Sequence, residues 1–233
     1  MKIILELLFP GRCPVCDRVQ PLGEIVCPQC ADSLERMRIQ SPFCRKCGKP
    51  LADSRDEYCG DCTAGGHRFL EGRALYPYPA VRKSIYRYKY QGRKEYAGFY
   101  AREMARHLGD TVRRWHPDAL VPVPLHRTRQ AVRGYNQAAA LAEALGRELG
   151  IPVENRLIRR VRKTVPQKLL RRQMRQNNLK RAFKISKNVV KLNTIIIIDD
   201  IYTTGSTVDA VTAVLQEAGI RQVYFITLAI GKG

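Results

Sequence analysis

The sequence has no apolar run long enough to cross a membrane and no cysteine beyond residue 62. A transmembrane helix needs about 18 or more consecutive apolar residues, so we expect no membrane insertion. The opening stretch MKIILELLFP is apolar, but Glu6 interrupts it and no small-residue cleavage site follows. We therefore expect a short helix or strand there rather than a signal peptide.

Acidic residues are scarce over residues 154–191, which contain 14 Lys or Arg and a single Glu. The net charge of the whole chain is +20, so this segment carries most of the basic excess. A run of charged residues is usually just solvated surface. Here nearly all the charges are positive, which solubility alone does not require. It favours a polyanionic partner or a multiply phosphorylated substrate.

The eight cysteines form four C-x-x-C pairs. Each pair is a tight knuckle that presents two thiolates to one metal, and two knuckles complete a tetrahedral zinc site. Because large apolar residues are few in this segment, metal should supply most of its folding energy. The expected ligands of two structural zinc ions are Cys13, Cys16, Cys27, Cys30, Cys44, Cys47, Cys59 and Cys62.

Other interpretations of the cysteines are weaker. Four disulfides would require an oxidising compartment, and no secretion signal is visible in the sequence. One C-x-x-C pair could be a redox motif, but four in tandem argue against it. Neighbouring knuckles are expected to pair, first with second and third with fourth, although the spacing leaves an interleaved pairing open.

The stretch IIIIDDIYTTGST, residues 195–207, joins a strand to a polar loop. Four consecutive isoleucines favour extended backbone, and the lack of polar alternation predicts a central strand of a parallel sheet. Asp199 and Asp200 then stand at its carboxyl end, where ligands bind in open α/β sheets. Two carboxylates there either chelate a cation or accept hydrogen bonds from vicinal hydroxyls.

The loop that follows is a predicted phosphate site. Gly205 permits a tight turn and close approach of a ligand, and a helix is expected from Val208. A ribose 5-phosphate has the matching layout, with two ring hydroxyls at one end and a phosphate at the other. The expected phosphate ligands are Thr203, Thr204, Gly205, Ser206 and Thr207.

The whole stretch resembles the phosphoribosyl-pyrophosphate (PRPP) motif of the type I phosphoribosyltransferases. The resemblance implies that Asp199 and Asp200 hold the ribose hydroxyls, that the loop holds the 5-phosphate, and that Mg²⁺ accompanies PRPP. Transferases for 6-oxopurines usually carry an aspartate, thought to act as general base, where this chain has Thr203. Guanine and hypoxanthine are therefore not expected as acceptors.

Other segments fit the same fold. Residues 74–79 are expected to form an edge strand, residues 119–126 a short buried strand, and residues 221–230 a final buried strand. A basic loop should precede a helix over about 136–149, and its candidate pyrophosphate contacts are His126, Arg127 and Arg133.

Residues 80–108 predict helical segments broken near Gly92, with tyrosines and basic residues interleaved. Such a mixture is typical of a nucleic-acid stacking surface. It is also typical of an amphipathic helix that buries its tyrosines, which is the interpretation we favour. The candidate basic contacts to a phosphate or to DNA are Lys89 here and Arg171, Arg172 and Arg175 in the basic segment.

Three elements together resemble the ComF family of competence-associated proteins. They are VPVPLHRTRQAVRGYNQA, the spacing of Thr164, Gln167, Arg175 and Asn178, and the acid stretch, all preceded by the cysteine knuckles. The resemblance implies a PRPP-binding type of fold and a role in natural transformation, handling single-stranded DNA in the cytoplasm. A helicase-type protein partner is a further candidate.

We therefore predict a doubly wound, mostly parallel α/β sheet of the type I phosphoribosyltransferase kind after a small zinc-ribbon domain. The expected boundaries are residues 1–66 for a double zinc ribbon and 67–233 for the α/β domain, with a basic mobile segment over 159–183. The alternative function is an active Mg²⁺-dependent phosphoribosyltransferase on a nucleobase-type acceptor, without a DNA role. The sequence leaves open whether catalysis occurs.

Overall fold

The computed structural model describes residues 10–21, 23–162, 182–186 and 192–231. Several predictions lie outside these residues. They are the short element expected at the N-terminus and most of the basic segment, including Thr164, Gln167, Arg171, Arg172, Arg175 and Asn178.

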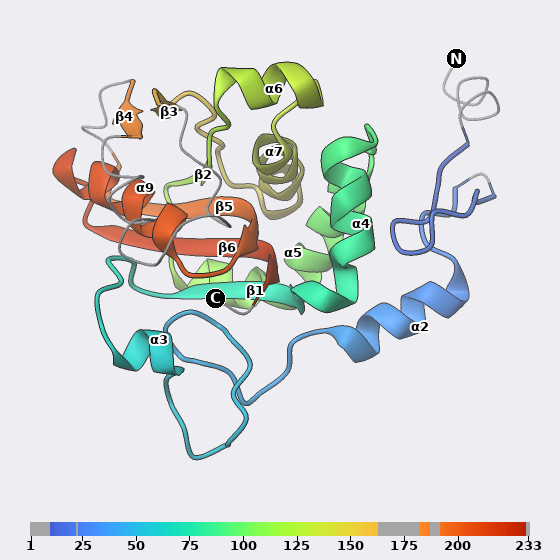
Figure 1. Ribbon diagram of the computed structural model, residues 1–233, viewed down its shortest axis with the longest axis horizontal. Helices are drawn as coiled ribbons and strands as arrows, with labels where there is room; N and C mark the ends of the chain where they lie inside the picture. Colours follow the sequence, from blue (N-terminus) through green and yellow to red (C-terminus); the bar gives the residue numbers. More distant parts are fainter. Residues whose placement is uncertain (1–9, 22, 163–181, 187–191, 232–233) are drawn as a thin grey trace.

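A four-stranded parallel sheet forms the centre of the fold, in the order β1-β6-β5-β2 (Figure 1). The strands are β1 (Gly72–Pro77), β2 (Ala119–Pro122), β5 (Thr194–Tyr202) and β6 (Gln222–Ile230). The isoleucine strand β5 lies between two neighbours, and β1, which ends at Pro77, lies at an edge. Both placements confirm the expectations from the sequence.

Helices cover both faces of the sheet because β5 is apolar on both sides. Ile196 and Ile198 pack in one core with α4 (Tyr78–Tyr90), α5 (Tyr96–Arg114) and α7 (Gln137–Leu149). Ile195 and Ile197 pack in a second core with α9 (Ser206–Glu217). Burying each such side chain contributes about 1.5–3 kcal/mol, so the two cores make this strand the anchor of the domain.

The helix predictions hold with one correction. The helical conformation is interrupted around Gly92, where φ is +68°, and this separates α4 from α5 as expected. The residues expected as a basic loop instead form the short helix α6 (Arg127–Arg133). The His126 side chain caps it by accepting from the Thr128 amide, and Gly134 ends it in the left-handed conformation.

A two-stranded antiparallel pair, β3 (Ile158–Arg160) and β4 (Phe183–Ile185), brackets the part of the basic segment that lies outside the described residues. Phe183 and Ile158 join the core on the α9 face. The ends of the predicted mobile segment are therefore anchored to the domain.

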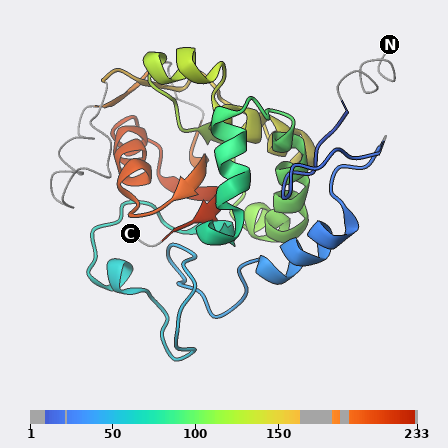
Figure 2. The ribbon, with the colours of Figure 1, turned by 45° about the vertical axis from the view of Figure 1, so that its right-hand side comes forward.

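The two cysteine-rich regions lie at different places around the sheet (Figures 1 and 2). The first, followed by α2 (Pro28–Met37), lies beside α4, whereas the second, which contains α3 (Gly60–Thr63), lies near β1. Among the described residues, no helix is long and apolar enough to span a membrane.

Candidate functional site

The two acids lie near the carboxyl end of β5, still within the strand. Asp200 faces α4, where Lys89 pairs with its carboxylate. Asp200 is buried and Asp199 is half-buried. The Asp200 amide donates to Asp199 Oδ1 at 2.8 Å, which fixes the position of the first carboxylate relative to the strand end.

A positive cluster surrounds this acid pair. Lys89 of α4 forms an ion pair with Asp200 Oδ2. Burial raises the pKa of Asp199 to about 6, although Lys89, Arg160 and Arg133 act in the opposite direction. Burial likewise lowers the pKa of Lys89 to about 8, while Asp199 opposes the change. The site is a compact set of opposite charges held in a poorly solvated position.

Residues 203–207, which we call the phosphate loop, comprise the connection after β5 and the first two residues of α9. Gly205 adopts a φ of +77° and is the N-cap residue of α9, so no side chain caps the helix. The hydroxyls of Thr204 and Ser206 are 2.7 Å apart. Since the first amides of a helix lack intrahelical partners, this start of α9 retains the capacity to bind an anion.

The candidate pyrophosphate residues lie on and beside α6. The His126 side chain caps the helix, and its Nδ1 atom lies 2.9 Å from the Thr128 hydroxyl. Arg127 is exposed. Arg133 donates to Gln137 Oε1 and to the Tyr90 hydroxyl, each at 2.9 Å, and its charge reaches Asp199. Of the three, only Arg133 is tied electrostatically to the acid pair in this structure.

The tyrosines of the α4–α5 segment divide between buried and exposed positions. Tyr88 and Tyr96 are buried in the core, as expected for an amphipathic helix. Tyr86 and Tyr90 are more than half exposed, with ring centroids 5.2 Å apart. The Arg133 guanidinium lies 4.7 Å from the centre of the Tyr90 ring. A small aromatic and cationic surface therefore borders the acid site.

The cysteines form two Cys₄ zinc-binding sites, and neighbouring knuckles pair. Within each set the four sulfur atoms lie within 4.8 Å of one another. Cys16 and Cys27 sulfurs are 3.8 Å apart, and Cys47 and Cys59 sulfurs 3.6 Å. Tetrahedral zinc with Zn–S bonds of about 2.3 Å requires separations of about 3.8 Å, so both sets fit the metal.

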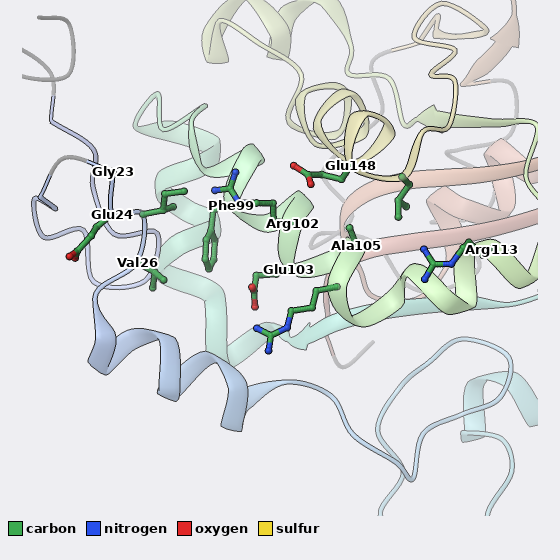
Figure 3. Close-up of a pocket in the computed structure, with 12 residues that line it drawn as sticks. Gly23, Glu24, Val26, Phe99, Arg102, Glu103, Ala105, Arg113 and Glu148 are labelled. Carbon is green, nitrogen blue, oxygen red and sulfur yellow. The ribbon is translucent and has the colours of Figure 1, made fainter. Parts of the chain in front are cut away.

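Two surface hollows lie away from the acids. One, of about 630 Å³, has Glu24 and Val26 of the first cysteine region on one side and α5 residues such as Arg102 on the other (Figure 3). The second, of about 510 Å³, lies between Val15 and the start of α4. Neither is lined by Asp199 or Asp200, so neither is the predicted ligand site.

The sequence analysis missed two features. Arg160 of β3 acts on the pKa of Asp199, although nothing in its local sequence distinguishes it from the other arginines of the basic segment. His67 Nδ1 lies 2.8 Å from Asp209 Oδ2 in the first turn of α9. These two residues are 142 positions apart, and no local pattern could have paired them.

Comparison with known proteins identifies both parts of the chain. Residues 4–63 match the double zinc ribbon domain, and residues 101–233 match the phosphoribosyl transferase domain. A purine phosphoribosyltransferase from Pyrococcus horikoshii aligns at 17% identity over 57% of this chain and 74% of that one. Its TM-score is 0.37, which is too low to support an inference.

Curated relatives align over most of both chains. Competence protein F of Haemophilus influenzae is 34% identical over 201 residues, 81% of this chain and 84% of the relative. DNA utilization protein YhgH of Salmonella typhimurium is 32% identical over 93% and 96%, respectively. Competence protein ComFC of Bacillus subtilis is 30% identical over 84% and 80%. The chain therefore belongs to the ComF family, in which a double zinc ribbon precedes a phosphoribosyltransferase domain.

Proposed function

We propose that this protein binds PRPP, or a closely related phosphoribosyl compound, in the cytoplasm and uses that binding in the handling of single-stranded DNA during natural transformation. The main support for phosphoribosyl binding is that two acids and a helix start without a side-chain cap lie together at the end of one central strand. A phosphoribosyl ligand needs both features a few residues apart.

Different residues of the site bind different parts of the ligand. Asp199 and Asp200 accept hydrogen bonds from the ribose hydroxyls, and the phosphate loop binds the 5-phosphate. Arg127 and Arg133, at opposite ends of α6, bind the diphosphate. Carboxylate oxygens are ligands that Mg²⁺ prefers, so the acid pair would hold the metal together with the ligand. Bound Mg²⁺ would neutralise charge on the diphosphate.

The proposed role in handling DNA is supported by the names of the relatives and by the exposed tyrosines of α4. The relatives bear the names competence protein and DNA utilization protein. Tyr86 and Tyr90, with Arg133 against the latter, offer the stacking faces and positive charge that unpaired bases and their backbone need. The strand would then pass the mouth of the phosphoribosyl site, where Lys89 already pairs with Asp200.

Two narrower roles rank below this proposal. An active transferase on a nucleobase would need a base to activate the acceptor, and Thr203 stands where 6-oxopurine enzymes usually have an aspartate. The names of the relatives also favour a DNA role over nucleotide metabolism. A helicase-type partner that docks through the zinc ribbons would extend the DNA role.

Ligand-induced thermal stabilisation tests PRPP binding. Saturating PRPP with Mg²⁺ should raise the melting temperature of the wild-type chain, because a ligand that binds only the folded state stabilises it. The Asp199→Asn/Asp200→Asn double variant keeps the side-chain volumes and should show no shift. An equal shift in the double variant would refute the site assignment.

Titration with a single-stranded oligonucleotide at increasing salt tests the DNA role. Because binding to phosphates releases counterions, affinity should fall steeply between low and physiological salt. Tyr86→Ala/Tyr90→Ala should weaken binding by about thirtyfold or more, since base stacking contributes about 1–3 kcal/mol per base and two stacking rings are lost. Tyr58→Ala, which removes an exposed tyrosine in the second cysteine region, is the control. Affinity that is independent of salt would exclude a phosphate-binding surface.

A further inference from the structure

The second Cys₄ site is part of the core that supports the phosphate loop. Cys44 and Cys47 are completely buried, in the same hydrophobic cluster as Phe69, Tyr202 and Val208. Tyr202 is the last residue of β5 before the phosphate loop, and its ring stacks on Phe225 at 4.6 Å. The metal site and the loop therefore share one packed interior rather than two separate domains.

His67 joins these two parts directly. It follows the last ligand of the second site, Cys62, by only five residues. Because an ionised carboxylate only accepts, His67 Nδ1 donates to Asp209 Oδ2 at 2.8 Å. The next amide in the chain, that of Arg68, donates to Asp209 Oδ1 at 2.8 Å. Both oxygens of Asp209 are thus held by the segment that leaves the zinc site.

The His67 ring also limits the shape of the phosphate loop. A Cβ atom on Gly205 would lie 2.7 Å from His67 Cε1 and 2.7 Å from the Tyr202 hydroxyl. The loop glycine is therefore enclosed between these two rings in its left-handed conformation. His67 itself is fixed, since its side chain is 5% exposed and stacks on Phe69 at 5.0 Å.

The hydrogen bonds to Asp209 have an electrostatic consequence. Asp209 lies in the first turn of α9, where a carboxylate interacts favourably with the helix dipole. A free carboxylate there would compete with a phosphate for the same amides and would repel it. The two donors instead hold the carboxylate towards the zinc-site segment, which leaves the start of α9 to a ligand.

We propose that His67 is a positioning residue of the phosphate loop, through which the second Cys₄ site keeps the start of α9 open to the 5-phosphate of a phosphoribosyl ligand. The proposal rests on the proposed function for the identity of the ligand. It goes further in assigning the double zinc ribbon a part in ligand binding.

The test compares two substitutions of His67 in the full-length chain. His67→Phe keeps an aromatic ring against Phe69 but has no donor for Asp209, whereas His67→Asn keeps a donor near the position of Nδ1. Calorimetric titration with ribose 5-phosphate and, separately, with pyrophosphate distinguishes the loop from the rest of the site. Zinc content and the melting temperature of each unliganded variant establish that the fold is intact.

We expect His67→Phe to lose about tenfold in affinity for ribose 5-phosphate, as for a hydrogen bond to a charged group, with pyrophosphate affinity unchanged. His67→Asn should stay within about threefold of wild type. Adding Asp209→Asn to His67→Phe should restore binding, because the competing charge is gone. Wild-type affinity in His67→Phe, equal loss of both ligands, or failure of the added Asp209→Asn to restore binding would overturn the proposal.

Amide hydrogen exchange of residues 203–209 in the unliganded chain separates this proposal from the proposed function. If wild type binds neither ribose 5-phosphate nor PRPP, the proposed function fails. Exchange that is faster in His67→Phe than in wild type and in His67→Asn would still support the positioning role. Equal exchange in all three chains would refute it.

Discussion

The two Cys₄ sites share ligands and spacing but differ in what surrounds them. In the first, Cys13 is buried but Cys16 is exposed, and Val15 and Val26 pack against the edge of the α4–α5 core. Polar groups complete the attachment: the Tyr96 hydroxyl donates to Asp17 at 2.7 Å, and Arg93 lies 3.3 Å from the same carboxylate. In the second, Cys44 and Cys47 are buried in the apolar core. One site is attached to the domain surface, and the other is built into its interior.

The position after the second cysteine of the first knuckle in each Cys₄ site illustrates the difference. Asp17 and Gly48 each follow the second cysteine of their knuckle, and both have a left-handed backbone, with φ of +64° and +76°. At Gly48 a Cβ atom would lie 2.9 Å from the Gly72 carbonyl oxygen of β1, so only glycine fits. Asp17 has room for a side chain, and that side chain reaches Tyr96 of α5.

The comparison also divides the candidate ligand site. The first knuckle contacts α4, where Arg87 donates to the Val15 carbonyl, and α4 carries Lys89 to the acid pair. The segment after the second Cys₄ site contacts the first turn of α9 through His67, and Cys44 and Cys47 share a core with Tyr202. In the proposed binding mode, the first zinc site supports α4, whose Lys89 lies next to the ribose. The second supports the start of α9, which binds the 5-phosphate.

Loss of a zinc ligand should produce the largest difference between the two sites. Cys47→Ser should lower the melting temperature by about 10 °C or more, because a structural zinc supplies folding energy and this one lies in the core. Cys16→Ser should lower it by less than about 5 °C and retain ribose 5-phosphate binding. Metal analysis should give two zinc ions per wild-type chain and about one in each variant. Equal destabilisation would show that the two sites are energetically alike.

Placing asparagine at the equivalent knuckle positions should give a smaller difference. Asparagine tolerates the left-handed backbone, so the substitution isolates what surrounds each position. Gly48→Asn should cost about 3 kcal/mol because the side chain meets the backbone of β1. Asp17→Asn should cost about 1 kcal/mol, through weaker contacts to Tyr96 and Arg93. Urea unfolding measures both, and an equal cost would contradict the close approach at Gly48.

The acid pair predicts an effect confined to acidic pH, a pH dependence of ligand binding at the carboxyl end of β5. Burial raises the pKa of Asp199 from 3.8 to about 6, and the ionised form is the one that accepts hydroxyl hydrogen bonds. Affinity for PRPP should therefore fall by about tenfold per pH unit below 6. Stability changes in the opposite direction, since a raised carboxyl pKa makes the folded state less stable as the pH rises from 3.8 towards 6.

Lys89→Met provides the control for this pH dependence. Lys89 lowers the pKa of Asp199, so its removal should shift the midpoint of the binding profile to a higher pH. The shift distinguishes titration of Asp199 from titration of the phosphate groups of the ligand, which the substitution leaves unchanged. A midpoint that does not move would remove Asp199 as the titrating group.

The sequence predicted the elements whose signals are local. Four adjacent isoleucines require burial on two faces, which placed β5 in the sheet interior, and paired C-x-x-C motifs indicated two zinc sites. Segment 127–133 was expected as part of a basic loop before the helix over about 136–149. It forms α6 because His126 caps its start and Gly134 ends it.

Contacts between distant parts of the chain could not be predicted. Tyr88 is buried, as an amphipathic helix requires, whereas Tyr86 and Tyr90 are exposed. Helical spacing predicts this division only once the core-facing side of α4 is known. Lys89, expected as a phosphate or DNA contact, pairs with Asp200 in the unliganded chain. The pairing of His67 with Asp209 likewise arises only when the zinc segment and α9 pack together.

A crystal structure of the chain with PRPP and Mg²⁺ tests the central claim most directly. We predict ribose hydroxyls within hydrogen-bond distance of the Asp199 or Asp200 carboxylate and the 5-phosphate on the amides of residues 203–207, with Lys89 no longer closed on Asp200. A ligand bound in the hollow beside Arg102, with the Lys89–Asp200 ion pair intact, would contradict the account.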